Sequence, residues 1–230
     1  MIDNFHYHFQ SIVGLQSETA LACELLLRSK EKFDPATINP LFFTSNLKSL
    51  TAKKIEAMNY LNRIETQWVF VNFSKSEIGH EDFYYCQAVM ASLLADRQIV
   101  IEVTECNASY NEAIFYENIT ILKANGFGIA IDDFGTGSST KHTLRNIKPD
   151  FVKLDMSLIR SATHSTSKEV AFFRLTDLLR HQGYKVVIEG IETEKQLAIA
   201  KKSRAEFGQG FFFHKPEIPF TDQIYTKQAI

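Results

Sequence analysis

The stretch that decides the fold lies near the start of the chain and reads YHFQSIV (7–13), GLQSET (14–19) and ACELLLR (22–28). The first and last of these segments are short and mainly apolar, which predicts two β-strands. Few residues join them, whereas parallel strands need a connection of a dozen or more residues. The two strands should therefore form an antiparallel hairpin.

Further along the chain, strand-like runs alternate with helix-like stretches. Strands are predicted at residues 68–73, 98–104, 128–132, 151–155, 185–189 and 209–213, and helices at 40–64, 83–94, 111–123, 168–181 and 194–203. This order predicts an α/β fold, a modified TIM-type (β/α)8 barrel whose first strand is antiparallel. An open doubly wound sheet is the structural alternative. We expect one domain over residues 1–230, because no Gly-, Ser- or Pro-rich linker divides the chain.

The composition excludes several classes of protein. Lys and Arg number 25 against 27 Asp and Glu in 230 residues, so there is no basic excess for binding a nucleic-acid polymer. The apolar runs are far shorter than the ~20 residues that cross a bilayer, and the N-terminus lacks a signal-peptide pattern. Three cysteines without CxxC spacing predict reduced thiols. We therefore expect a cytoplasmic protein without membrane insertion.

Polar and charged residues gather where the predicted strands end. This set comprises Glu24, Arg28, Asn72, Glu102, Glu105, Asp132, Asp133, Lys153, Asp155, Glu189, Glu192 and Gln209. The carboxyl ends of barrel strands form the mouth at which TIM-barrel active sites lie. Taken singly, each residue has an ordinary explanation as a helix cap, a turn residue or a solvated rim residue, and Lys153 could snorkel from a strand edge.

Taken together, the carboxylates favour a metal site. Carboxylates within apolar strands are costly to ionise unless cations neutralise them, and Arg28 and Lys153 are the obvious counter-charges. Oxygen ligands without clustered Cys or His favour hard ions such as Mg²⁺ or Mn²⁺. Two such ions in a carboxylate-rich site suit attack of an activated water on phosphorus. The sequence therefore predicts a metal-dependent phosphodiesterase or phosphatase.

The same residues resemble the motifs of the EAL-domain family, bacterial phosphodiesterases that act on cyclic di-GMP. In chain order the matching segments are Glu24-Leu25-Leu26 with Arg28, Asn72-Phe73-Ser74, Glu102-Val103-Thr104-Glu105, Asp132-Asp133-Phe134-Gly135-Thr136-Gly137, Lys153-Leu154-Asp155, Glu189-Gly190-Ile191-Glu192 and Gln209-Gly210. They cover residues 9–216, nearly the whole chain, and the ordered set is highly specific.

The resemblance implies a role for each matched residue. The metal ligands would be Glu24, Asn72, Glu102, Asp132, Asp133 and Glu189, which would hold two Mg²⁺ or Mn²⁺ ions. The catalytic residues would be Lys153, Glu189 and Glu24, with Lys153 orienting the attacking water. The substrate contacts would be Gln10, Arg28 and Gln209. Glu105, Asp155 and Glu192 would support the site, Glu105 by steadying the loop 133–137, near which the family forms homodimers.

Some positions depart from the family pattern. Leu25 replaces an Ala and should point away from Glu24, into the layer between barrel and helices. Ser11 stands in place of a Pro, and the loop 138–142 differs from the family's Tyr-Ser-Ser-Leu. No departure removes a matched catalytic side chain.

The resemblance therefore implies a stand-alone cyclic di-GMP phosphodiesterase that produces linear pGpG. The alternative is a weak or inactive EAL protein that acts as a cyclic di-GMP receptor or binds a protein partner.

Overall fold

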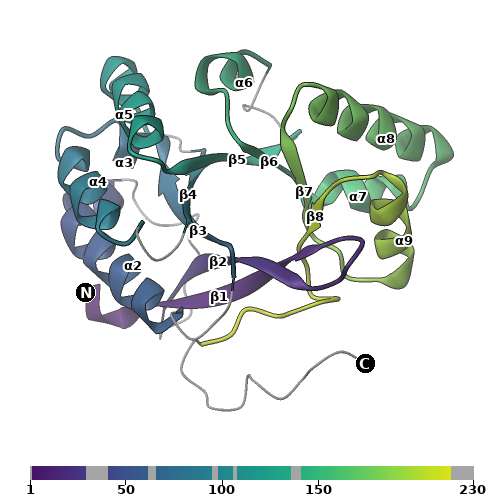
Figure 1. The fold of residues 1–230 in the computed structure, drawn as a ribbon, viewed down its shortest axis with the longest axis horizontal. Helices are drawn as coiled ribbons and strands as arrows, with labels where there is room; N and C mark the ends of the chain where they lie inside the picture. Colours follow the sequence, from purple (N-terminus) through teal and green to yellow (C-terminus); the bar gives the residue numbers. More distant parts are fainter. Residues whose placement is uncertain are drawn as a thin grey trace.

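The strands of this protein close into a barrel in chain order (Figure 1). The computed structural model describes residues 2–29, 41–61, 66–94, 98–105, 108–135 and 141–218. Within them the strands are β1 (Phe5–Gly14), β2 (Ala20–Ser29), β3 (Trp68–Ser74), β4 (Gln98–Thr104), β5 (Gly128–Phe134), β6 (Phe151–Leu154), β7 (Lys185–Ile188) and β8 (Phe207–Gly208). The closed barrel confirms the predicted fold and excludes the open sheet.

The first strand runs against its two neighbours. β1 pairs with β2 in antiparallel register, with Gln10 opposite Glu24, and meets β8 antiparallel through Val13 and Gly14. Every other pair from β2 to β8 is parallel. The predicted hairpin is therefore confirmed. Because of its reversed direction, β1 brings its N-terminal half to the barrel end at which β2 to β8 finish.

Helices cover the outside of the barrel (Figure 1). In the described part of the chain they are α1 (Leu41–Ser45), α2 (Leu47–Tyr60), α3 (Lys75–Ile78), α4 (Phe83–Ala91), α5 (Glu112–Ala124), α6 (Lys141–Ile147), α7 (Met156–Ala162), α8 (Thr166–His181) and α9 (Glu194–Lys202), preceded by the 3₁₀ helix η1 (Ile2–Asn4). The helix predicted at 40–64 is two helices, α1 and α2. The short helices α3, α6 and α7 were not predicted, because a helix of one or two turns has too few residues to show a periodic apolar face.

Two apolar layers hold the barrel together. Side chains pointing inward form a small cluster that includes Phe70, Phe151 and Phe207, and the rings of Phe70 and Phe151 pack edge to face with centroids 5.0 Å apart. Side chains pointing outward pack beneath the helices in a larger cluster. Leu25 is fully buried in that outer layer, as predicted for the residue that replaces the family's Ala.

The last strand lies earlier than predicted. The sequence placed it at 209–213, but β8 covers only Phe207–Gly208 and residues 211–213 form a turn. Gly210 explains the early end: a Cβ there would lie 2.1 Å from the carbonyl oxygen of Ile191. Beyond it, Phe211 is 54% exposed and Phe212 38% exposed. These aromatic residues are as apolar as strand residues in the sequence, but they are not buried.

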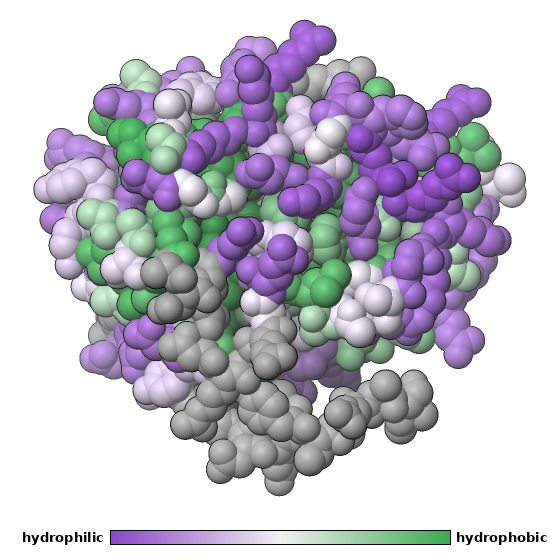
Figure 2. Space-filling view, in the orientation of Figure 1, coloured by the Kyte–Doolittle hydropathy of each residue, from purple (hydrophilic) through white to green (hydrophobic). Residues whose placement is uncertain are grey.

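The surface is mostly polar on the face drawn in Figure 2, with apolar residues scattered among the charged ones. Among the described residues, no helix combines the length and apolar character needed to cross a membrane.

Candidate active site

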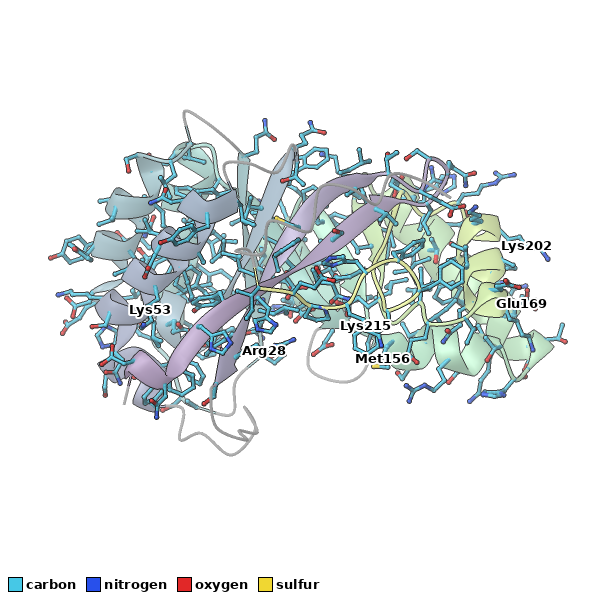
Figure 3. All side chains as sticks on the ribbon, turned by 90° about the horizontal axis from the view of Figure 1, so that it is seen from below. Arg28, Lys53, Met156, Glu169, Lys202 and Lys215 are labelled. Carbon is cyan, nitrogen blue, oxygen red and sulfur yellow. The ribbon has the colours of Figure 1, made fainter. Side chains whose placement is uncertain are left out.

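The predicted site residues come together at one end of the barrel, because almost every strand delivers one of them there. Glu24, Asn72, Glu102, Asp132 and Lys153 lie in or at the ends of β2 to β6. Glu189 follows β7 and Gln209 follows β8. Gln10 lies on β1 and is at the same end of the barrel because β1 runs in the opposite direction to β2. In Figure 3, Arg28 of β2 and Met156, which opens α7 just after β6, both lie toward the lower edge and mark this end.

Lys153 lies at the centre of the site and is only 1% exposed. Its Nζ lies 2.5 Å from Glu102 Oε1, 2.8 Å from Glu189 Oε1 and 3.0 Å from Glu24 Oε2. A fourth carboxylate oxygen, Asp132 Oδ1, lies 3.5 Å away. One ammonium group therefore faces four carboxylates, and Lys153 does not snorkel to solvent.

The carboxylates carry more negative charge than this lysine balances. Burial, followed by repulsion from Glu24, raises the pKa of Glu102 well above its usual range. Burial also raises the pKa of Glu189 to about 8, although the neighbouring Lys153 opposes the shift. Burial disfavours the charged lysine, yet the carboxylates led by Asp132 outweigh it and raise the pKa of Lys153 well above its usual range. A divalent cation would relieve this excess of negative charge.

Two amide side chains fix Glu24. Asn72 Nδ2 donates to Glu24 Oε1 at 2.7 Å and to the carbonyl oxygen of Leu25 at 3.3 Å. Gln209 Nε2 donates to Glu24 Oε2 at 2.8 Å and to Gln10 Oε1 at 3.2 Å. Because the side-chain nitrogen of Asn72 is the donor in both bonds, its side-chain oxygen is not used in them.

The donor set fits hard divalent cations. One oxygen each from Glu24, Glu102 and Glu189 lie within 4.8 Å of one another, and so do one each from Asp132, Asp133 and Glu189. Glu102 Oε2 and Asp132 Oδ1 are buried without a hydrogen-bond partner among the described residues. Orphaned carboxylate oxygens are costly in a protein interior, and all the ligands are oxygens, as Mg²⁺ or Mn²⁺ prefers. Glu189 belongs to both groups.

Asp133 lies at the edge of this cluster. Its backbone adopts a left-handed conformation, with φ of 49°. Burial, followed by repulsion from Asp132 and Asp155, raises its pKa to about 6. Asp155 accepts a hydrogen bond from the backbone N–H of Ser157 at 2.8 Å and so caps α7. Residues 136 and 137 of the predicted loop 133–137 lie outside the described residues, as do residues 138–140 of the variant segment 138–142.

The remaining predicted residues lie around the cluster. Arg28 is half-buried and donates to the carbonyl oxygen of Leu27 at 2.9 Å. Glu105 accepts two hydrogen bonds from Lys75 Nζ, at 2.7 and 2.8 Å. The side chain of Glu192 is exposed and belongs to neither carboxylate group, while its backbone N–H donates to Gln196 Oε1 at 2.8 Å.

A buried ion pair behind Asn72 was not predicted. Lys54 Nζ donates to the backbone carbonyl oxygen of Asn72 at 2.7 Å and lies 3.5 Å from Glu77 Oε1. Glu77 in turn accepts from the N–H and the hydroxyl of Ser74, both at 2.8 Å. The spacing of Ser74 and Glu77 matches a helix capping box, so their contact could have been predicted from the sequence. The burial of Lys54 could not, because a lysine on a helix usually faces solvent.

The sequence and the fold both match known proteins. The sequence model of the EAL domain family matches residues 2–216. The probable cyclic di-GMP phosphodiesterase PdeG of Escherichia coli K12 is 30% identical over 221 residues, which are 90% of this chain and 44% of PdeG. The chain thus spans less than half of that relative.

Two solved structures show the same fold. The manganese and cyclic di-GMP complex of BlrP1 from Klebsiella pneumoniae has a TM-score of 0.80 at 26% identity, covering 94% of this chain and 57% of that chain. The cyclic di-GMP complex of the PaMucR phosphodiesterase has a TM-score of 0.78 at 25% identity, covering 94% of this chain and 92% of that chain.

Proposed function

Because this chain belongs to the EAL domain family, we propose that it hydrolyses cyclic di-GMP to linear pGpG and thereby lowers the level of this second messenger. The observation that carries the proposal is the cluster of carboxylates around Lys153 at the mouth of the barrel. It is supported by the relative named a probable cyclic di-GMP phosphodiesterase and by the two matched structures, which are complexes with cyclic di-GMP.

The proposed cofactors are two Mg²⁺ or Mn²⁺ ions. The residues that would hold them are Glu24, Asn72, Glu102, Asp132, Asp133 and Glu189. When bound, such ions would neutralise the phosphate oxygens and lower the pKa of the attacking water.

Side chains of this protein would orient the water, accept a proton and bind the substrate. Lys153 would donate a hydrogen bond that orients the attacking water, and Glu189 would accept a proton from it. The water oxygen would form the new bond to phosphorus as the bond to the ribose oxygen breaks. The proton of the water would pass to Glu189, and the ribose oxygen would take up a proton from solvent and remain in pGpG as a hydroxyl group. Arg28 would bind a phosphate oxygen, while Gln10 and Gln209 would contact the substrate and hold Glu24 in place.

The test is product formation from cyclic di-GMP, followed by chromatography, with Mg²⁺, Mn²⁺ or EDTA. We expect linear pGpG with either metal and none with EDTA. Glu24→Gln should abolish turnover, whereas Glu117→Gln, on the exposed face of α5, should leave it unchanged. Turnover that survives EDTA or Glu24→Gln would contradict the proposal. Binding of cyclic di-GMP without any turnover would support the receptor function instead.

We propose that the protein works in the cytoplasm as a homodimer, with dimer contacts near the loop 133–137. Sedimentation of the purified protein tests the homodimer. Binding of a protein partner stays a separate prediction from the sequence.

A further inference from the structure

Two histidines on β1 lie side by side outside the carboxylate cluster. His6 and His8 are two residues apart on one strand, so their side chains lie on the same face of β1. A strand rises ~3.4 Å per residue, which places them about 14 and about 7 Å from Gln10 along β1. Both side chains are half-buried, so an ion can reach them from solvent.

The two imidazole rings have the spacing of a pair of metal ligands. Their Nε2 atoms lie 3.2 Å apart, and their ring centroids lie 5.1 Å apart. Zn²⁺ binds histidine nitrogen at about 2.0–2.1 Å in a tetrahedral arrangement, which places two ligating nitrogens about 3.3 Å apart and their ring centroids about 5 Å apart. Both separations in this protein therefore match two rings that hold one ion.

The backbone contact of His8 leaves its Nε2 available to a metal. His8 Nδ1 lies 3.4 Å from the carbonyl oxygen of Pro216, which can only accept a hydrogen bond. With its proton on Nδ1, a neutral His8 carries a lone pair on Nε2, the atom that faces His6. Histidines that bind metals usually donate their other N–H to a carbonyl or carboxylate in this way.

In the metal-free protein, the same lone pair can accept a hydrogen bond from Nε2–H of His6. A bound ion would take the place of that shared proton. A neutral His6 would then carry its proton on Nδ1, so both imidazoles would stay neutral, as metal ligands must be.

Nitrogen ligands select a different kind of ion from the carboxylate cluster. Imidazole suits Zn²⁺, Cu²⁺ and Ni²⁺, whereas Mg²⁺ and Mn²⁺ prefer oxygen ligands. Arg28 lies directly opposite His6 on β2, and its positive charge further disfavours a hard cation that gains little from nitrogen. The pair of histidines should therefore discriminate against the ions that the carboxylates favour.

We infer that His6 and His8 form a binding site for one transition-metal ion of the Zn²⁺ class, separate from the carboxylate cluster. The two Nε2 atoms would fill two positions of a tetrahedral site, and water would fill the other two. No group of three or more possible ligands among the described residues includes either histidine. The inference goes beyond the proposed function, because it requires neither cyclic di-GMP nor turnover.

The first test counts the nitrogen ligands. Cu²⁺ is added to the wild-type protein, His6→Gln, His8→Gln and His164→Gln, and electron paramagnetic resonance reports the histidine nitrogens bound to the ion. His164 is exposed and provides the matched control. We expect two nitrogens in the wild type and the control, and fewer in each site variant. Fewer than two in the wild type, or two in either site variant, would overturn the inference.

The second test measures affinity for Zn²⁺ by calorimetry in excess Mg²⁺, which competes for the carboxylate cluster. Loss of a residue behind a metal ligand already costs about 10- to 100-fold in affinity, so each site variant should lose at least about tenfold. Thermal unfolding in EDTA shows whether the variants are folded. Weaker Zn²⁺ binding by folded site variants supports the inference, and wild-type affinity in both of them contradicts it.

The third test needs no variant. Nuclear magnetic resonance of the histidine side chains follows the wild-type protein as Zn²⁺ is added in excess Mg²⁺. Resonances of His6 and His8 should change together, and those of His164 should not. Changes confined to other histidines, or no change at His6 and His8, would refute the site.

Discussion

Lys153 is the residue that contacts most of the carboxylates in this site. Its ammonium group faces four carboxylates and is almost completely buried. Leaving buried charges without their partner costs about 3–5 kcal/mol. We therefore expect Lys153→Met to lower the stability of the metal-free protein by about that amount, measured by thermal unfolding in EDTA. Added Mn²⁺ should recover more stability in this variant than in the wild type, and an unchanged unfolding temperature in EDTA would contradict the central role of Lys153.

The shifted carboxyl groups predict how stability depends on pH. The pKa of Glu189 is about 8 and that of Asp133 about 6, both above the values of an unfolded chain. A raised pKa in the folded state gives stability that is present below the unfolded pKa and is lost as pH rises through the folded pKa. The metal-free protein should therefore lose stability between about pH 4 and about pH 8.

The measurement is the unfolding temperature across that pH range, in EDTA and in Mn²⁺. Because cations compete with protons for the same oxygens, Mn²⁺ should reduce the loss at high pH. Glu189→Gln should flatten the EDTA profile, and Glu117→Gln serves as the control. A wild-type profile that rises with pH in EDTA would contradict the assigned shifts.

At the scale of elements, the pair of Lys54 on α2 and Glu77 on α3 holds the end of β3 from behind. The ammonium group of Lys54 bonds to the backbone of Asn72 and lies 3.2 Å from the ring centroid of Phe73. Lys54→Met or Glu77→Gln alone should cost about 3–5 kcal/mol of folding stability, since each leaves a buried partner uncompensated. The double variant should cost less than the sum, as coupled neighbours do.

Chemical denaturation of the two single variants and the double variant measures this coupling. The exposed pair of Lys48 and Asp82 is the control, and its disruption should change stability little. Strict additivity in the Lys54 and Glu77 variants would show that the two side chains act independently. Because Lys54 bonds to the Asn72 backbone, the single variants should also weaken Mn²⁺ binding.

The elements also show where sequence reasoning succeeds and where it fails. The hairpin was predictable because a short connection leaves no room for a crossover helix. β8 was misplaced because Phe211 and Phe212 are as apolar as strand residues, while the close approach of Gly210 to Ile191 exists only in three dimensions. The ends of β4 matched the prediction at Gln98 and Thr104, since four of the five residues between them are apolar.

At the scale of the whole molecule, the site depends on the closed barrel. Its predicted ligands come from β2, β3, β4 and β5 and from the segment after β7, so metal binding should stabilise the barrel as a unit. At a free Mn²⁺ concentration of about 100 times Kd, the expected gain is about 2.7 kcal/mol per site. Thermal unfolding against Mn²⁺ concentration measures this gain, and Glu102→Gln should reduce it. A gain of equal size in that variant would place the ion elsewhere.

Much of the candidate site was predictable because its residues lie at strand ends in a fixed order along the chain. Glu24, Asn72, Glu102, Asp132 and Lys153 could be grouped from the sequence alone, since a closed barrel brings strand ends together. The residues that support them could not. Lys54 is specified only by packing, and the pairing of His6 with Arg28 needs the strand register that the sequence leaves open.

The reversed first strand has a consequence for how the chain folds during synthesis. The ring closes where Val13 and Gly14 meet Gly208 and Phe207, almost two hundred residues later in the chain, with a further bridge between Phe9 and Glu217. A nascent chain emerges from the ribosome N-terminus first, so the edge of β1 that pairs with β8 stays unpaired until the last strand appears. Such distant contacts form slowly, because a long loop must close before they stabilise anything. Emergence of β8, rather than synthesis of the carboxylate strands, is therefore the event that completes the barrel and its active site.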